Sequence, residues 1–223
     1  MTGIRAMLGA TVLAGVAAAQ QSISFPTRDG GLIFADAYGK GDRAIVLAHG
    51  GRFDRKSWDR QAKVLAGVGF RVMAIDFRGE GESRGGSQSR SLEEGRPLDI
   101  LAAIDYLRKD GAKSVSVVGA SMGGDYAAEA AETEPAAIDR LVLLASGAYT
   151  PLTHMKGRKL FLVARDDANA DGPRLPRIRV QYAKAEGPKE LIVVDGSAHA
   201  QFLFDTDQGE RVMREILRFL EAP

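Results

Sequence analysis

The chain has 223 residues, 45% of them hydrophobic and 26% charged, a composition typical of a soluble globular domain that excludes disordered, collagen-like and polytopic membrane proteins. Lysine and arginine total 30 against 29 acidic residues, so the formal net charge of +1 offers no basic excess for binding nucleic acid. Cysteine is absent, which excludes disulfides, thiolate metal sites and a cysteine nucleophile.

Residues 1–19 have the layout of a secretory signal peptide. Arg5 precedes an uncharged apolar run over Ala6–Val16, and a small-x-small cleavage pattern ends at Ala19. The run is too short to cross a bilayer comfortably as a helix, so we expect no stable membrane anchor. The pattern predicts a secreted or periplasmic protein of residues 20–223, in place of the alternative, a buried N-terminal helix.

After this segment, continuous apolar runs alternate with stretches in which apolar residues recur three or four positions apart. The first pattern favours buried strands and the second favours amphipathic helices. The predicted strands are 22–25, 32–38, 44–48, 70–75, 115–118, 141–145, 160–163 and 191–194. The predicted helices are 56–67, 98–107, 122–132 and 212–219. Buried strands separated by helices predict one α/β domain with a mainly parallel sheet covered on both faces.

The sharpest motif is the run Gly119-Ala120-Ser121-Met122-Gly123, which joins a predicted strand to a predicted helix. Strand and helix pass closely at such a turn, so the residues two before and two after the serine must be small, as Gly119 and Gly123 are. The turn places the Ser121 hydroxyl at the carboxyl end of the strand, beside unpaired helix N–H groups. This context predicts a nucleophilic serine; the alternative is a glycine-rich helix start without chemistry.

A nucleophilic serine needs a general base, and His199 is the predicted one. It follows the last predicted strand, and parallel strands bring their carboxyl ends to the same edge of the sheet, where Ser121 also lies. His154, in the loop after the strand 141–145, is the alternative base, although no carboxylate surrounds it in the sequence.

The acid that orients the base is expected at the end of the strand 160–163, where Asp166 and Asp167 follow each other. Two adjacent aspartates cannot both face the histidine. We prefer Asp167, with Asp166 as the alternative. Asp195 is nearer to the histidine in sequence but is expected to cap its own turn.

Glycines follow the strand 44–48 in the run His49-Gly50-Gly51. Glycine lets the backbone turn its N–H groups toward a reaction centre, so the Gly51 N–H, or alternatively that of Arg52, is expected to form an oxyanion hole with the Met122 N–H. His49 is expected to order this loop. The run Asp76–Ser83 lacks the third glycine and the adjacent helix of a nucleotide-binding loop and is expected to be a packing and turn element.

Together these motifs resemble the α/β-hydrolase superfamily, in particular small bacterial members similar to dienelactone hydrolase. The resemblance runs from Ser22 to Phe219 and includes the chain order Ser121, Asp167, His199. It implies a serine esterase that acts on small or medium carboxylic esters through an acyl-enzyme and needs no metal or organic cofactor. Dienelactone hydrolase uses a cysteine nucleophile, which this chain lacks, so serine-ester chemistry is implied instead.

Two alternatives stay open. The same site would also suit thioester, amide or peptide hydrolysis, or acyl transfer to another acceptor. A catalytically silent fold used as a binding module is the second alternative. The expected partner is a small-molecule ester, with no nucleic acid, and the oligomeric state is left open.

The site is expected to be open to solvent. The twelve residues 147–158 between the sixth and seventh predicted strands contain two glycines and a proline and are too few for a helical lid. No other loop except 78–90 is expected to be long enough to cover the site. Phe53, Tyr149 and Phe202 are expected to be the apolar neighbours of the substrate.

Overall fold

A computed structural model describes residues 20–86, 91–147 and 150–222 of the chain. The predicted signal segment 1–19 and the predicted substrate neighbour Tyr149 lie outside the described residues, so both stay predictions. Among the helices of the described ranges, none combines the length and the hydropathy that crossing a bilayer requires.

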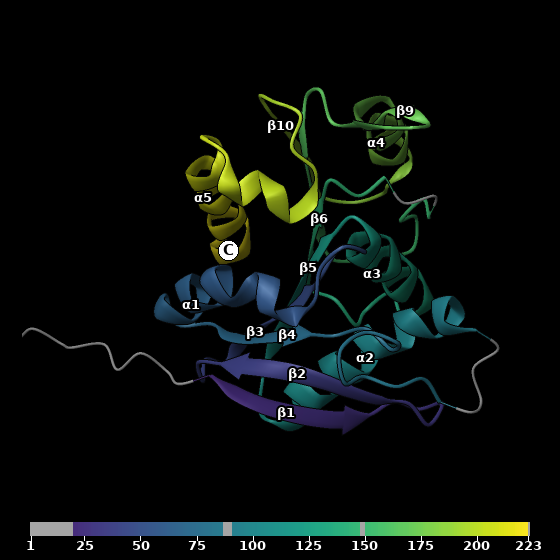
Figure 1. Ribbon diagram of the computed structural model, residues 1–223, viewed down its shortest axis with the longest axis vertical. Coiled ribbons are helices and arrows are strands. Elements are labelled where there is room, and N and C mark those ends of the chain that lie inside the picture. Colours follow the sequence, from purple (N-terminus) through teal and green to yellow (C-terminus); the bar gives the residue numbers. More distant parts are fainter. Residues whose placement is uncertain (1–19, 87–90, 148–149, 223) are drawn as a thin grey trace, which may run out of the picture.

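The centre of the fold is an eight-stranded sheet with the strand order β1-β2-β4-β3-β5-β6-β7-β10 (Figure 1). The strands are β1 (Gln21–Pro26), β2 (Leu32–Tyr38), β3 (Arg43–Ala48), β4 (Arg71–Ile75), β5 (Ser114–Ala120), β6 (Arg140–Leu144), β7 (Arg158–Ala164) and β10 (Lys189–Val194). All neighbours from β4 to β10 pair in parallel, while β2 is antiparallel to both β1 and β4. The predicted mainly parallel sheet is confirmed.

Helices cover both faces of this sheet (Figure 1). They are η1 (Arg55–Trp58), α1 (Asp59–Gly67), α2 (Leu92–Lys109), α3 (Met122–Thr133), α4 (Arg174–Lys184), η2 (Ala200–Asp205) and α5 (Gly209–Glu221). Buried side chains of α2, α3 and α4 form one apolar core, and those of α1, η2 and α5 form the other. β3 shows why the strands read as unbroken apolar runs: Val46 packs into the first core, and its neighbours Ile45 and Leu47 pack into the second.

The glycine-rich turn after β4 is held by a buried arginine. Arg78 is fully buried, and its Nε donates to Asp99 Oδ1 at 2.8 Å, while its Nη2 donates to Asp29 Oδ1 at 3.0 Å. A Cβ added to Gly95 of α2 would lie 1.8 Å from Arg78 Nη1, so this position has no room for a side chain. The expectation of a packing and turn element is therefore confirmed.

The expectation that no loop besides 78–90 is long enough to cover the site is wrong. The segment between β7 and β10 carries a short hairpin, β8 (Ala168–Asn169) with β9 (Gly172–Pro173), followed directly by α4. Two prolines hide this helix in the sequence. Pro173 precedes α4, and Pro176 lies in its first turn, where a missing N–H costs no intrahelical hydrogen bond.

Candidate active site

The backbone between β5 and α3 is strained at Ser121. This residue has φ 48° and ψ −117°, a backbone conformation that residues other than glycine rarely adopt. A Cβ on Gly119 would lie 2.6 Å from Gly123 O, and a Cβ on Gly123 would lie 2.4 Å from Ala48 O. The predicted steric demand for glycine on both sides of the serine is thus confirmed, and the packed glycines hold the strained turn in place.

Three residues from distant parts of the chain are joined at this turn by hydrogen bonds. His199 Nε2 lies 2.8 Å from Ser121 Oγ, and His199 Nδ1 lies 2.7 Å from Asp167 Oδ2. An ionised carboxylate only accepts, so Nδ1 carries the proton and Nε2 is left to accept the serine O–H. The Asp167 side chain is 1% exposed and that of His199 is 28% exposed, so the acid is shielded from water while the histidine is accessible.

The alternatives weighed for the base and the acid have other partners. His154 is largely exposed, and its Nδ1 lies 2.8 Å from Glu132 Oε2 of α3, a carboxylate that its neighbours in sequence do not reveal. Asp166 is exposed, and its N–H donates to the carbonyl of Gly196. Asp195 lies 3.3 Å from the guanidinium of Arg165.

The loop after β3 presents backbone N–H groups to the same place. The Gly50 N–H donates to Gln201 Oε1 at 3.1 Å, whereas the N–H groups of Gly51, Arg52 and Met122 donate to no residue that the structure describes. A Cβ on Gly51 would lie 3.6 Å from Met122 Sδ. The N–H groups of Gly51 and Met122 stay the predicted oxyanion hole, with that of Arg52 as the alternative to Gly51.

His49 orders this loop, as predicted. Its Nδ1 donates to the Gly50 carbonyl at 2.9 Å, and its Nε2 accepts the Phe77 N–H at 3.4 Å. Burial lowers the pKa of His49 below its ordinary value, which favours the neutral ring that this pattern of one donor and one acceptor requires.

A cavity of about 560 Å³ lies over Ser121 and His199. The rings of Phe53 and Phe202, both predicted neighbours of the substrate, line it with their centroids 4.9 Å apart. No group of three or more histidine, aspartate or glutamate side chains within the described ranges is placed to hold a metal ion.

The sequence reasoning missed three contributors to this site. Arg174 lines the cavity, and its Nε lies 3.2 Å from Asp167 Oδ1, the carboxylate oxygen that does not face His199. That N–H is not directed at the oxygen, so the contact is an ion pair without a hydrogen bond. Gln201 links the histidine segment to the loop after β3 and also donates to Ser57 Oγ. No local pattern in the sequence marks either residue.

Asp125, the third missed residue, lies in the first turn of α3. It accepts a hydrogen bond of 2.6 Å from Ser146 Oγ, and burial raises the pKa of its carboxyl. Its position one turn after Ser121 was visible in the sequence, but its partner was not.

A family model and several curated proteins are similar to this chain. Residues 39–203 match the family described as serine aminopeptidase, S33. A 2-hydroxy-6-oxononadienedioate/2-hydroxy-6-oxononatrienedioate hydrolase of Cupriavidus pinatubonensis is 32% identical over 119 residues, 51% of this chain and 39% of the relative. A non-heme chloroperoxidase of Streptomyces lividans is 29% identical over 147 residues, 66% of this chain and 48% of the relative. The chain thus spans less than half the length of these curated relatives.

Solved structures share the whole fold. The Pyrococcus furiosus esterase Pf2001 superposes with a TM-score of 0.75 at 17% identity, over 98% of this chain and all of that one. A predicted CIB-like hydrolase of Thermoplasma acidophilum has a TM-score of 0.73 at 22% identity, over 91% and 98% of the two chains. With a strained serine turn at the carboxyl edge of a mainly parallel sheet and a family match over residues 39–203, this chain belongs to the S33 serine aminopeptidase family of the α/β-hydrolase superfamily.

Proposed function

We propose that the chain is a serine hydrolase that cleaves carboxylic esters of small or medium size through an acyl-enzyme on Ser121. The observation that carries the proposal is the unbroken chain of hydrogen bonds from Asp167 through His199 to the serine hydroxyl. Binding alone does not require a buried acid, an accessible histidine and a strained serine in one line, so this arrangement favours catalysis over a silent binding module.

The chemistry follows from the positions of these groups. His199 Nε2 takes the Ser121 proton as the oxygen attacks the ester carbonyl, and Asp167 stabilises the charged imidazole. The N–H groups of Gly51 and Met122 stabilise the negative oxygen of the tetrahedral intermediate, a contribution of about 10²–10³ in kcat for one such donor. The histidine returns its proton to the departing alcohol. It then activates a water molecule that releases the acyl group from the serine.

Peptide hydrolysis from a free amino terminus is the competing function, because the matched family is described as serine aminopeptidase. Such an enzyme binds the protonated amine of its substrate, which calls for a carboxylate in the cavity. The described residues that line the cavity include Arg52 and Arg174 and no aspartate or glutamate. This charge disfavours a cationic substrate and supports the ester assignment.

The proposal is tested by labelling and by activity. A fluorophosphonate probe is expected to label the wild-type protein at Ser121 and to leave Ser121→Ala unlabelled. Purified wild-type protein is then assayed on 4-nitrophenyl esters of increasing acyl length and on aminoacyl 4-nitroanilides. Hydrolysis of short esters supports the proposal. Absence of labelling, or turnover of the anilides without turnover of the esters, overturns it.

We also propose that residues 1–19 are removed on export, leaving residues 20–223 as one domain outside the cytoplasm. The charge and apolar run of this segment support the proposal. Mass spectrometry of natively expressed protein is expected to find a mature terminus at or near Gln20. An intact segment on cytoplasmic protein would contradict export.

A further inference from the structure

The cavity over Ser121 carries an excess of positive charge. Its described lining residues include two arginines, Arg52 and Arg174, and no acidic side chain. Asp167 lies behind the lining, almost fully buried, and is already paired with His199 and Arg174. The Asp167 carboxylate is therefore already paired within the protein. The charged side chains that a ligand in the cavity can contact are those of Arg52 and Arg174.

Of the two arginines that line the cavity, Arg52 is the one without a partner among the described residues. It follows Gly51 directly, its side chain is exposed at the cavity, and it makes no ion pair or hydrogen bond with any residue that the structure describes. The two acidic residues nearest to it along the chain have other partners. Asp54 accepts the Lys56 N–H at 2.9 Å, and Asp59 lies 2.7 Å from Lys63 Nζ. Its planar guanidinium, whose paired N–H donors match a carboxylate, is thus free to bind a ligand.

Arg174 adds a second positive charge to the cavity, next to the acid Asp167. Its Nε lies 3.2 Å from Asp167 Oδ1 without a hydrogen bond, and its terminal nitrogens make no hydrogen bond to a described residue. Arg177, one turn later in α4, differs: its guanidinium donates to Asn169 at 3.2 Å and lies 4.0 Å from Asp171. Arg177 thus has partners of its own and, unlike Arg174, does not line the cavity.

We propose that Arg52 binds a carboxylate of the substrate, so that the preferred ester is anionic, with Arg174 strengthening the local positive potential. The inference rests on the proposed function, since it names the substrate class of the same site. Phe53 and Phe202 then contact the carbon skeleton between the carboxylate and the scissile ester. The carboxylate belongs either to the acyl part, as in a half-ester of a dicarboxylic acid, or to the alcohol part, as in an acylated hydroxy acid.

Two matched pairs of esters distinguish these sources. Monomethyl glutarate against methyl pentanoate tests the acyl side, with acid release followed in a pH-stat. 4-Acetoxybenzoate against its methyl ester tests the alcohol side. For at least one pair, wild-type protein is expected to show a kcat/KM about tenfold or more higher for the anionic member, which is the size of one charge-assisted hydrogen bond. Added salt is expected to reduce this preference because the site is open to solvent.

Variants separate this inference from the proposed function. Arg52→Gln is expected to lower the anionic-to-neutral ratio of kcat/KM about tenfold, and Arg52→Lys is expected to retain part of the preference. Arg60→Gln, which removes an arginine of a separate cavity, is the matched control and leaves the ratio unchanged. Thermal unfolding checks that each variant is folded.

The results distinguish a failure of the carboxylate site at Arg52 from a failure of the esterase proposal. Hydrolysis of neutral esters with no anionic preference, or a preference that survives in Arg52→Gln, overturns the carboxylate site and leaves the esterase proposal standing. No hydrolysis of any ester, together with no fluorophosphonate labelling, overturns the esterase proposal and the inference with it.

Discussion

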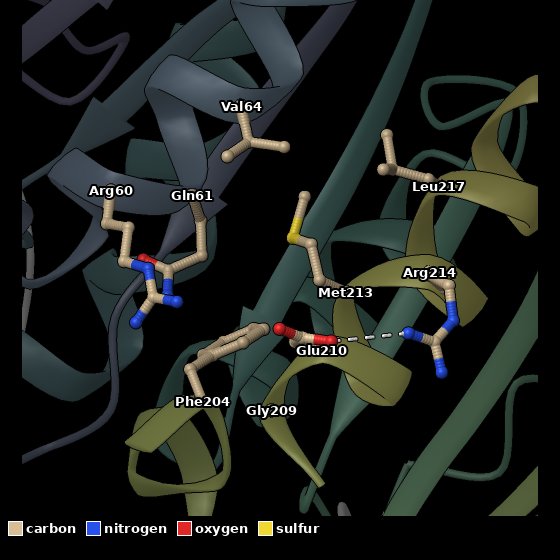
Figure 2. A pocket seen from close by; sticks show the side chains of 9 residues that line it. All are labelled: Arg60, Gln61, Val64, Phe204, Gly209, Glu210, Met213, Arg214 and Leu217. Carbon is tan, nitrogen blue, oxygen red and sulfur yellow. Dashed lines mark ion pairs between the residues drawn. The ribbon is translucent and has the colours of Figure 1, made fainter. Parts of the chain in front are cut away.

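The cavity over Ser121 and a second cavity of about 280 Å³ between α1 and α5 differ in how they are built. Figure 2 shows the second cavity, where side chains of α1, among them Arg60 and Val64, face Met213 and Leu217 of α5. Its lining comes mainly from two regular helices. The first cavity is lined instead by loops that follow β3, β5, β7 and β10 at one edge of the sheet.

The two cavities also differ in the polar groups that they offer to a ligand. Helical residues satisfy their backbone N–H groups within the helix, and in the second cavity Glu210 Oε2 lies 3.7 Å from Arg214 Nη1, one turn further along α5. The strand ends at the first cavity leave the Gly51 and Met122 N–H groups without a described partner. Parallel strands therefore concentrate unsatisfied donors, a strained serine and a free arginine at one edge.

The largest expected loss of activity comes from two residues that line the first cavity and not the second. Ser121→Ala and His199→Ala should each lower kcat on a short ester by about 10⁴ or more, because each removes a member of one catalytic unit. The double variant should be little worse than either single one. Steady-state kinetics on folded protein measures both effects, and Ser121→Ala within about tenfold of wild type would end the assignment of the nucleophile.

The two adjacent aspartates after β7 are expected to differ strongly in their effect on activity. Asp167→Asn should lower kcat by about 10³–10⁴, since an amide in contact with Nδ1 favours the wrong tautomer of His199. Asp166→Asn is the matched control and should stay within about threefold, because its side chain is exposed. A larger loss in the Asp166 variant would move the acid by one residue.

The buried ion pairs under the site predict an effect on folding. Arg78→Met should destabilise the protein by about 3–5 kcal/mol, because it leaves Asp29 and Asp99 charged and buried without their guanidinium. Denaturant unfolding measures the loss. Arg28→Met, which removes a largely exposed pair with Glu134, is the control and should cost at most about 1 kcal/mol.

Removing the ion pair behind Asp167 should have a moderate effect on turnover. Arg174→Gln should lower kcat by about tenfold, as expected for losing a partner that helps to orient the carboxylate. Arg174→Lys should recover part of the loss. Arg177→Gln is the neighbouring control, since that guanidinium has partners outside the triad. Equal losses in both glutamine variants would show a general effect of α4 rather than positioning of Asp167.

The smallest effect is expected in the second cavity. Met213→Leu conserves volume between α1 and α5 and should change kcat/KM less than twofold. A tenfold change in kcat/KM on any ester would contradict the comparison, because it would show that the cavity between α1 and α5 affects activity at Ser121.

Much of this site could be predicted because its demands are local. The glycines around Ser121 follow from the close passage of β5 and α3, and the order of strands and helices follows from apolar periodicity. The choice between Asp167 and Asp166 depends on how the chain turns at the end of β7, so local sequence supports a preference for Asp167 without excluding its neighbour. Helix α4 was missed because its prolines favour a loop in any local reading.

The sequence by itself determined the strained turn at Ser121, the need for glycine beside it and the alternation of elements that builds a mainly parallel sheet. These features depend on contacts within a few residues or on a period of two or 3.6. Only the tertiary structure decided that Arg174 faces Asp167, that Gln201 holds the Gly50 N–H across 151 positions of the chain and that Arg52 is left without a described partner. Such contacts depend on which strands are neighbours in the sheet, and strand order is set by the packing of the whole core rather than by any local pattern.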